Sequence, residues 1–116
     1  MDYLNFAIKN FEEEKYEIAI EYCNKLIEKK IHLETAYRVK AFSEYYLCED
    51  KDDEIIKDAL KNINLAITLN QNNDNLFYIK TCILKYMKQF ENAIVEINKA
   101  IYLYLKQKCI FLIAIY

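Results

Sequence analysis

Apolar side chains recur every three or four residues along almost the whole chain, the interval of an amphipathic helix. Short polar stretches interrupt this pattern and divide it into segments of helical length. The pattern predicts seven helices: Asp2–Glu13, Tyr16–Glu28, Leu33–Cys48, Asp53–Leu69, Asn75–Met87, Phe90–Tyr104 and one that begins near Lys108.

The connections between these helices are short and polar, so neighbouring helices are expected to run antiparallel. They contain no Gly, and Asn is expected to take the left-handed conformation where a turn needs one. The charged run 49–54 could be read as a calcium loop, but it lacks the Gly and the ligand spacing of such a site. We expect a solvated connection, with Asp53 capping the helix that follows.

The second helix of each expected hairpin is nearly the same sequence written three times, beginning at Tyr16, Ile56 and Phe90. Ala59 and Ala93 are 34 residues apart, whereas Ala19 and Ala59 are 40 apart, which is one period plus a six-residue insertion. The charged run can hold that insertion. A small residue at this position lets two helices approach closely, and the large residues beside it fill the space between stacked units.

This pattern resembles the tetratricopeptide repeat family over essentially the whole chain. The second-helix motif of the family, aromatic-x-x-Ala-Ile, is matched by Tyr16/Ala19/Ile20, by Phe90/Ala93/Ile94 and less well by Ile56/Ala59/Leu60. The later small residue of that helix is matched by Ala66 and Ala100 but is Leu26 in the first copy. In the first helix the small position falls on Ala7, Ala41 and Thr81, and the large one on Tyr3, Tyr37 and Phe77.

The resemblance implies an all-α, right-handed α–α superhelix of about three units, 2–32, 33–73 and 74–107, with a partial C-terminal helix at 108–116. Residues 1–116 then form one domain. The Gly and the helix-ending Pro of the family are missing, and Ile31, Gln71 and Leu105 stand where Pro would be. Helix 33–48 has two open registers, because Val39, Phe42, Ser43 and Tyr46 make a second plausible core set.

Members of this family bind peptides or partner proteins in a concave groove lined by the first helix of each unit. The resemblance places ten residues on or near that groove: Leu4, Ile8, Phe11, Arg38, Phe42, Tyr45, Tyr78, Cys82, Lys85 and Tyr86. The clamp with which some members hold a chaperone's C-terminal carboxylate is not expected, because Leu4, Ile8, Val39, Asn75 and Ile79 stand at its positions.

Composition supports helices and gives catalysis no basis. The chain has no Gly and no Pro, which argues against hairpin-rich β folds and excludes a Gly-rich phosphate loop. The single histidine, His32, is expected to be an exposed turn residue. Four scattered cysteines indicate buried or half-buried thiols in a reducing compartment rather than a disulfide framework or a zinc site. We therefore expect no enzyme activity, no cofactor and no metal.

Charge and hydropathy bear on partners and location. Residues 1–75 carry 10 basic and 16 acidic side chains, a net of −6, and residues 76–116 carry 6 and 2, a net of +4. This dipolar distribution suits a protein partner better than nucleic acid, which needs a concentrated basic face. No signal peptide and no membrane span are expected, which predicts a cytoplasmic protein.

The stretch 109–116 is apolar all round, whereas the last helix of a repeat array is normally polar outside. Two explanations are open: the chain is the first part of a longer array, or this stretch pairs with another copy. The sequence thus predicts a scaffold that binds a peptide or partner protein of unknown identity. The alternative is a self-associating structural module that forms a homo-oligomer through 109–116.

Overall fold

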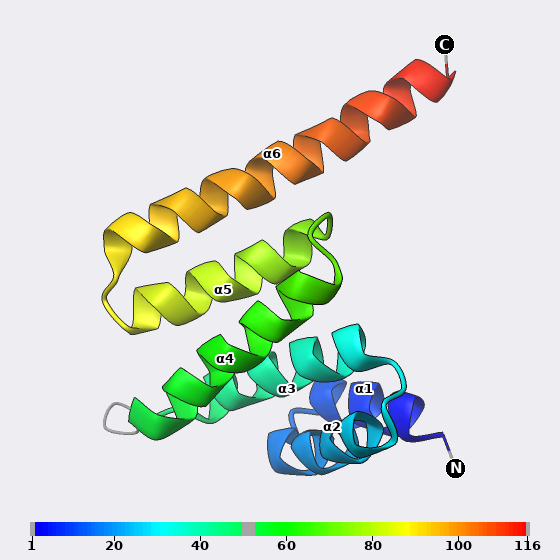
Figure 1. The fold of residues 1–116 in the computed structure, drawn as a ribbon, viewed down its shortest axis with the longest axis vertical. Helices are drawn as coiled ribbons and strands as arrows, with labels where there is room; N and C mark the ends of the chain where they lie inside the picture. The colour runs from blue at the N-terminus through cyan, green and yellow to red at the C-terminus, as the bar shows by residue number, and fades with distance from the viewer. Residues whose placement is uncertain (1, 50–52, 116) are drawn as a thin grey trace.

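The computed structural model describes residues 2–49 and 53–115, with side chains at 2–49 and 54–109. Those residues form six helices and no strand, so the predicted all-α class is confirmed for them. Figure 1 shows the helices stacked as successive hairpins, with the C-terminal helix crossing one end of the stack. Their bounds are α1 Tyr3–Glu12, α2 Tyr16–Lys29, α3 Leu33–Leu47, α4 Asp53–Leu69, α5 Asp74–Tyr86 and α6 Phe90–Ile115.

The C-terminal helix differs from the prediction. The chain was expected to turn after Tyr104 and to begin a partial unit near Lys108, but α6 is continuous from Phe90 to Ile115. The reason lies in the residues at the expected break: Leu105-Lys106-Gln107-Lys108 are all good helix formers, and neither Gly nor Pro is present to end the helix.

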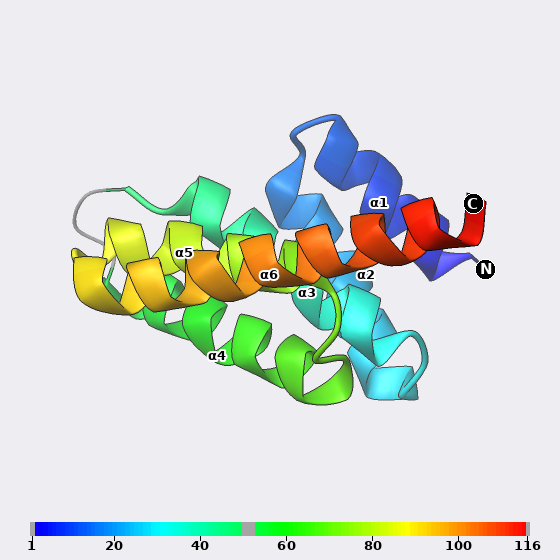
Figure 2. The ribbon, with the colours of Figure 1, turned by 90° about the horizontal axis from the view of Figure 1, so that it is seen from above.

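The helices pack in a regular order along the stack. Each helix packs on the next, and α1 also contacts α3 while α3 contacts α5. Among the described residues, the even-numbered helices make no comparable contact with one another. The odd helices therefore lie on the side where successive hairpins come closest, and Figure 2 shows the hairpins crossing one another at an angle.

The positions expected to hold small residues are all buried. In the first helices these are Ala7, Ala41 and Thr81, and in the second helices Ala19, Ala59 and Ala93. Leu26, Ala66 and Ala100, at the later position, are buried as well. The two helices of each hairpin thus pack through equivalent side chains.

Helix α3 buries residues from both of the registers that the sequence left open, although Phe42 of the second set is half-buried and Tyr46 is exposed. Ala36, Val39 and Ser43 are buried on one side of it, and Ala41 and Glu44 are buried on another. This double burial follows from its place in the stack, because α3 contacts α1, α2, α4 and α5. A central helix of a stack has no single polar face.

The turns correct one expectation. No described Asn takes the left-handed conformation; Glu14, Lys30, His32 and Lys88 do, with φ values of 62°, 58°, 49° and 62°. Glu14 and Lys88 end α1 and α5 with the same hydrogen bonds: Lys15 N donates to Asn10 O at 2.8 Å, and Gln89 N donates to Leu84 O at 2.9 Å. This five-residue span is the Schellman helix ending. Asn serves elsewhere, as Asn73 caps α5 by accepting from Asn75 N at 3.0 Å.

The charged connection falls mostly on residues 50–52, which lie outside the described residues, and the side chain of Asp53, expected to cap α4, lies outside them too. One part of the insertion is visible. α2 and α6 begin at Tyr16 and Phe90, which align with Ile56, so Asp53–Ile55 form an additional first turn of α4.

The cysteines depart from the expectation at one position. Cys23 is buried and Cys48 and Cys82 are half-buried, as expected, but Cys109 is exposed. It lies on the last part of α6, which extends past α5 (Figure 1).

Candidate partner-binding surface

The ten residues assigned to the groove all lie on the odd helices: three on α1, three on α3 and four on α5. None of the ten is fully buried; Tyr78 and Lys85 are exposed and the other eight are half-buried. Four of them, Phe11, Phe42, Tyr45 and Tyr86, contact one another between the odd-numbered helices. Their role in binding stays a prediction.

Aromatic rings connect these three helices without a break. The Phe11 and Phe42 rings are 5.5 Å apart between α1 and α3, and Phe42 lies 6.0 Å from Tyr45. Tyr45 then meets Tyr86 of α5 at 6.4 Å, edge to face. Such distances are typical of favourable ring pairs. The rings form one surface that runs across all three hairpins.

Two rings of this surface are absent from the predicted site. Tyr46 stacks on Phe42 at 4.9 Å and on Tyr16 of α2 at 5.1 Å, and half of its surface is exposed. The sequence signal was the spacing of four residues between Phe42 and Tyr46, which puts both on one face of a helix. The second register treated Tyr46 as core, and the structure places it at the surface.

The hydroxyl groups of Tyr45 and Tyr78 have raised pKa values. Burial is the main factor that raises the pKa of Tyr45, and the neighbouring Cys82 thiol raises that of Tyr78. Each tyrosine can then both donate and accept a hydrogen bond. Tyr86 already uses its hydroxyl, which donates to Glu49 O at 2.6 Å and ties α5 to the end of α3.

Charged groups flank the aromatic surface. Arg38 Nε lies 3.6 Å from Glu34 Oε1 within α3, and Glu34 also accepts from Asn73 Nδ2 at 3.4 Å. Lys85 is exposed near the end of α5. Arg38 is thus held by a carboxylate, whereas the described contacts leave Lys85 open to solvent.

The positions of the carboxylate clamp have a different character. Val39 and Ile79 are buried between helices, and Leu4 and Ile8 are half-buried aliphatic side chains. Asn75 is exposed, but a single amide is a poor substitute for the cations that hold a carboxylate.

Other chemistry is sparse in the described residues. His32 is exposed at the N-terminus of α3, as predicted for a turn residue. No group of three or more His, Cys, Asp or Glu side chains within residues 2–49 and 54–109 is arranged to hold a metal ion. In the described part of the chain, no helix combines the length and the apolar character that crossing a membrane requires.

No known protein family matches the chain, and neither a curated protein nor a solved structure matches it.

Proposed function

We propose that this protein is a binding module of the tetratricopeptide type that holds a peptide or a partner's extended segment against its odd helices. The observation that carries the proposal is the unbroken aromatic surface over α1, α3 and α5. Tyr and Phe offer large contact areas at a low cost in side-chain entropy, which is why they dominate binding surfaces.

The packing order supports a concave surface on this side. In a curved stack, the helices that contact each other across units lie on the inner side. The odd-numbered helices of the described residues contact each other in this way, and the even-numbered helices do not. A right-handed superhelix of three repeats would produce this order. The equivalent buried small residues and the matching helix endings at Glu14 and Lys88 further support a true repeat.

The chemistry of the surface favours a ligand rich in apolar and aromatic side chains. The rings are neutral, and the cations near them, Arg38 and Lys85, are few. A chaperone carboxylate is not the proposed ligand, because aliphatic side chains occupy the clamp positions. The scattered thiols favour the cytoplasm as the compartment.

Selection of binding peptides from a random phage-displayed library would test the proposal. A selected peptide carrying a fluorophore would be titrated with the protein, and its Kd measured by fluorescence anisotropy. Tyr46→Ala and Tyr78→Ala, both at exposed positions, are each expected to weaken binding about 10-fold. Tyr102→Ala is the matched control, since Tyr102 is an exposed tyrosine on α6 and should leave the Kd unchanged.

The proposal would be wrong if no peptide were selected, or if Tyr102→Ala reduced binding while the two groove variants did not. Circular dichroism of each variant separates lost binding from lost folding.

A further inference from the structure

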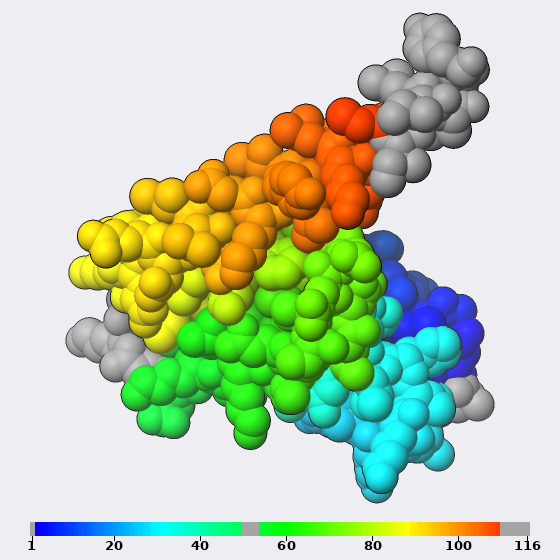
Figure 3. Space-filling model, turned by 45° about the horizontal axis from the view of Figure 1, so that its top comes forward, coloured from blue at the N-terminus to red at the C-terminus, as the bar shows by residue number. Residues whose placement is uncertain are grey.

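Helix α6 carries a row of large apolar side chains that leave at least half of their surface exposed in the described structure. Phe90 is 57% exposed and Ile94 is 58% exposed, whereas Ile56, the residue of α4 that aligns with Phe90, is only 2% exposed. The row continues with Ile101 and Leu105, both exposed. Figure 3 shows α6 lying along the outer edge of the stack.

The equivalent residues of α4 show how such a row is covered inside the stack. In α4 the counterparts of Phe90, Ile94 and Ile101 are Ile56, Leu60 and Ile67. Ile56 is buried and the other two are half-buried, and all three pack in one cluster with the fully buried Leu76, Ile79 and Ile83 of α5. In α6 the small residues Ala93 and Ala100 are buried, with α5 as the helix that α6 contacts. The face that is left open is therefore the one that an apolar helix covers elsewhere in the chain.

The opposite end of the stack cannot supply that helix. Asp2, Asn5 and Lys9 of the α1 segment align with Leu76, Ile79 and Ile83, and all three are exposed polar residues. A polar face of this kind is what a terminal repeat needs for solubility. Placing it on Ile94 and Ile101 would bury charged and amide groups without partners, which excludes a head-to-tail chain of copies.

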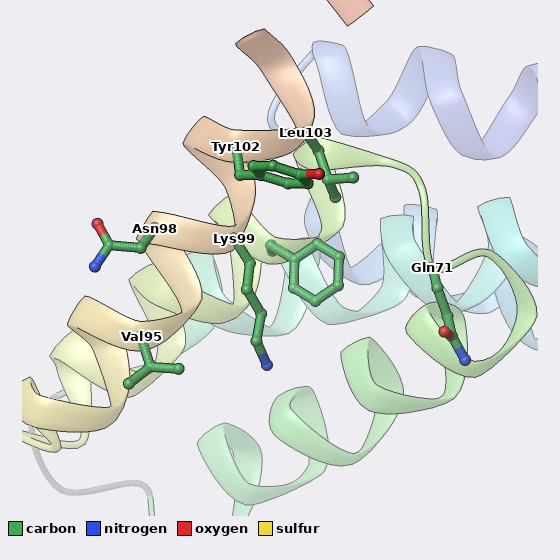
Figure 4. A pocket seen from close by; sticks show the side chains of 7 residues that line it. Gln71, Val95, Asn98, Lys99, Tyr102 and Leu103 are labelled. Atoms are coloured by element: carbon green, nitrogen blue, oxygen red, sulfur yellow. The ribbon is translucent and has the colours of Figure 1, made fainter. Parts of the chain in front are cut away.

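One flank of α6 is also unsuited to an apolar partner. Figure 4 shows Val95, Asn98, Lys99 and Tyr102 around an open hollow of about 390 Å³, to which Gln71 and Leu103 also contribute. Lys99 Nζ lies 5.8 Å from the centre of the Phe77 ring in this hollow. The apolar row lies on a different face of α6. Its residues Ile101 and Leu105 line a second hollow with Asp74, Asn75 and Tyr78 of the α5 segment, and this hollow shares no residue with the first.

The apolar row of α6 is complementary to itself. Its residues 90, 94, 101 and 105 are separated by four, seven and four positions, so the spacing is the same when the helix is followed in either direction. In an antiparallel pair, Phe90 meets Leu105 of the other copy and Ile94 meets Ile101. The ends match in charge as well, because Glu91 of one copy then lies at the same end as Lys106 and Lys108 of the other. A parallel pair would bring like charges together.

We propose that the protein forms a closed two-fold dimer in which the α6 helices of two copies pack antiparallel through Phe90, Ile94, Ile101 and Leu105. A two-fold interface is self-complementary and cannot grow into a filament. This interface places the apolar residues of the stack's open end against one another and leaves the polar α1 end in water. It does not depend on the proposed peptide binding by the odd helices.

Sedimentation velocity of the 116-residue chain over a range of concentrations is the first test, and a monomer–dimer equilibrium is expected. Ile94→Glu and Ile101→Glu should each raise the dissociation constant of the dimer at least 10-fold. Ile18→Glu is the matched control, since Ile18 is an exposed isoleucine on α2 and should leave the dimer intact. A monomer at every concentration, or species that keep growing with concentration, would overturn the proposal.

Chemical cross-linking tests the orientation of the pair. Antiparallel packing centred between residues 97 and 98 brings the two copies of residue 98 together and holds the two Cys109 residues roughly 34 Å apart. A short bismaleimide should therefore link Asn98→Cys in a Cys109→Ser background, and should not link the protein through native Cys109. Linking through native Cys109 would mean parallel helices, since a parallel pair brings the two copies of every residue together, and would overturn the proposal. Failure of Asn98→Cys to link would overturn it as well.

Charge reversal provides a readout if an apolar variant fails to fold. Lys106→Glu with Lys108→Glu should weaken the dimer several-fold, and adding Glu91→Lys should recover most of that loss. Unchanged dissociation constants in both variants would contradict the antiparallel register. Peptide titrations of the same variants should be unaffected, which separates this proposal from the proposed function.

Discussion

At the scale of single residues, the helix endings show how the chain turns without glycine. Glu14, Lys30 and Lys88 each hold a left-handed backbone at the C-terminal end of a helix. Their side chains raise the energy of this conformation, whereas Gly adopts it without a clash. The hydrogen bonds of the Schellman ending compensate for part of this strain.

Replacing these residues by Gly should therefore stabilise the protein. Glu14→Gly and Lys88→Gly are each expected to add about 0.5–1 kcal/mol to the free energy of unfolding, measured by urea denaturation. Glu13→Gly is the matched control, because φ of Glu13 is −84° and Gly there mainly adds freedom to the unfolded chain. Stabilisation by all three, or by none, would contradict the explanation.

A buried carboxyl group between α3 and α4 provides a second prediction at this scale. Glu44 is buried, accepts from Asn62 Nδ2 at 2.6 Å, and shares a hydrogen bond with Asp58 near Lys40. Burial is the main factor that raises the pKa of Glu44 to about 8, and the hydrogen bond with Glu44 lowers that of Asp58. The folded protein thus keeps a proton on Glu44 at neutral pH.

Stability should then fall as the pH rises from about 4.5, the usual pKa of a glutamate, to about 8. Within this window the folded state binds more protons than the unfolded state, so the slope can reach about 1.4 kcal/mol per pH unit. Asp58 acts with the opposite sign and only below its own usual value of 3.8.

Glu44→Gln should remove this slope, because an amide can donate to Asp58 and accept from Asn62 without binding a proton. Thermal denaturation from pH 5 to pH 8 measures the effect. Glu28→Gln, at an exposed position on α2, should retain the original slope. An unchanged slope in Glu44→Gln would mean that another group titrates.

At the scale of the elements, hairpin packing depends on residues that lack bulk. Ala59 is fully buried on α4, and the matching Ala19 and Ala93 are buried on α2 and α6. Interiors packed this densely have no room for additional methylene groups. The same position therefore sets the distance between the helices in all three hairpins.

Ala59→Leu should destabilise the protein by about 1–3 kcal/mol, because the larger side chain forces α4 away from its neighbours. Lys61→Leu places the same side chain at an exposed position of α4 and should change stability by less than about 0.5 kcal/mol. Urea denaturation of both variants measures the difference, and equal effects would contradict the packing argument.

The length of α6 shows why one boundary was misplaced. The apolar period weakens near residue 105, and a turn was expected there by analogy with the two earlier units. Backbone hydrogen bonding continues regardless of amphipathicity where every residue favours a helix. Only a chemical stop signal ends a helix reliably, and residues 105–108 contain none.

At the scale of the whole molecule, the repeat could be predicted because similar residues recur at fixed intervals along the sequence. Residues 74 positions apart, such as Ala19 and Ala93, have the same environment in the first and third hairpins. The surface was harder to predict. Tyr46 belongs to the second predicted core set of α3 but is exposed, and a helix that contacts four others buries residues on several sides. The register depends on the positions of all those neighbours, which local sequence does not contain.

The packing order also has a consequence for the time course of folding. Among the described residues, no helix packs on another more than two places away along the chain. When contacting segments are close in the sequence, forming each contact costs little loop-closure entropy, and folding is fast. The first hairpin can therefore assemble while later residues are still being synthesised, and each new helix finds its docking surface already in place. α6 follows the other five described helices, so the surface that would join two copies is completed only after those helices have packed.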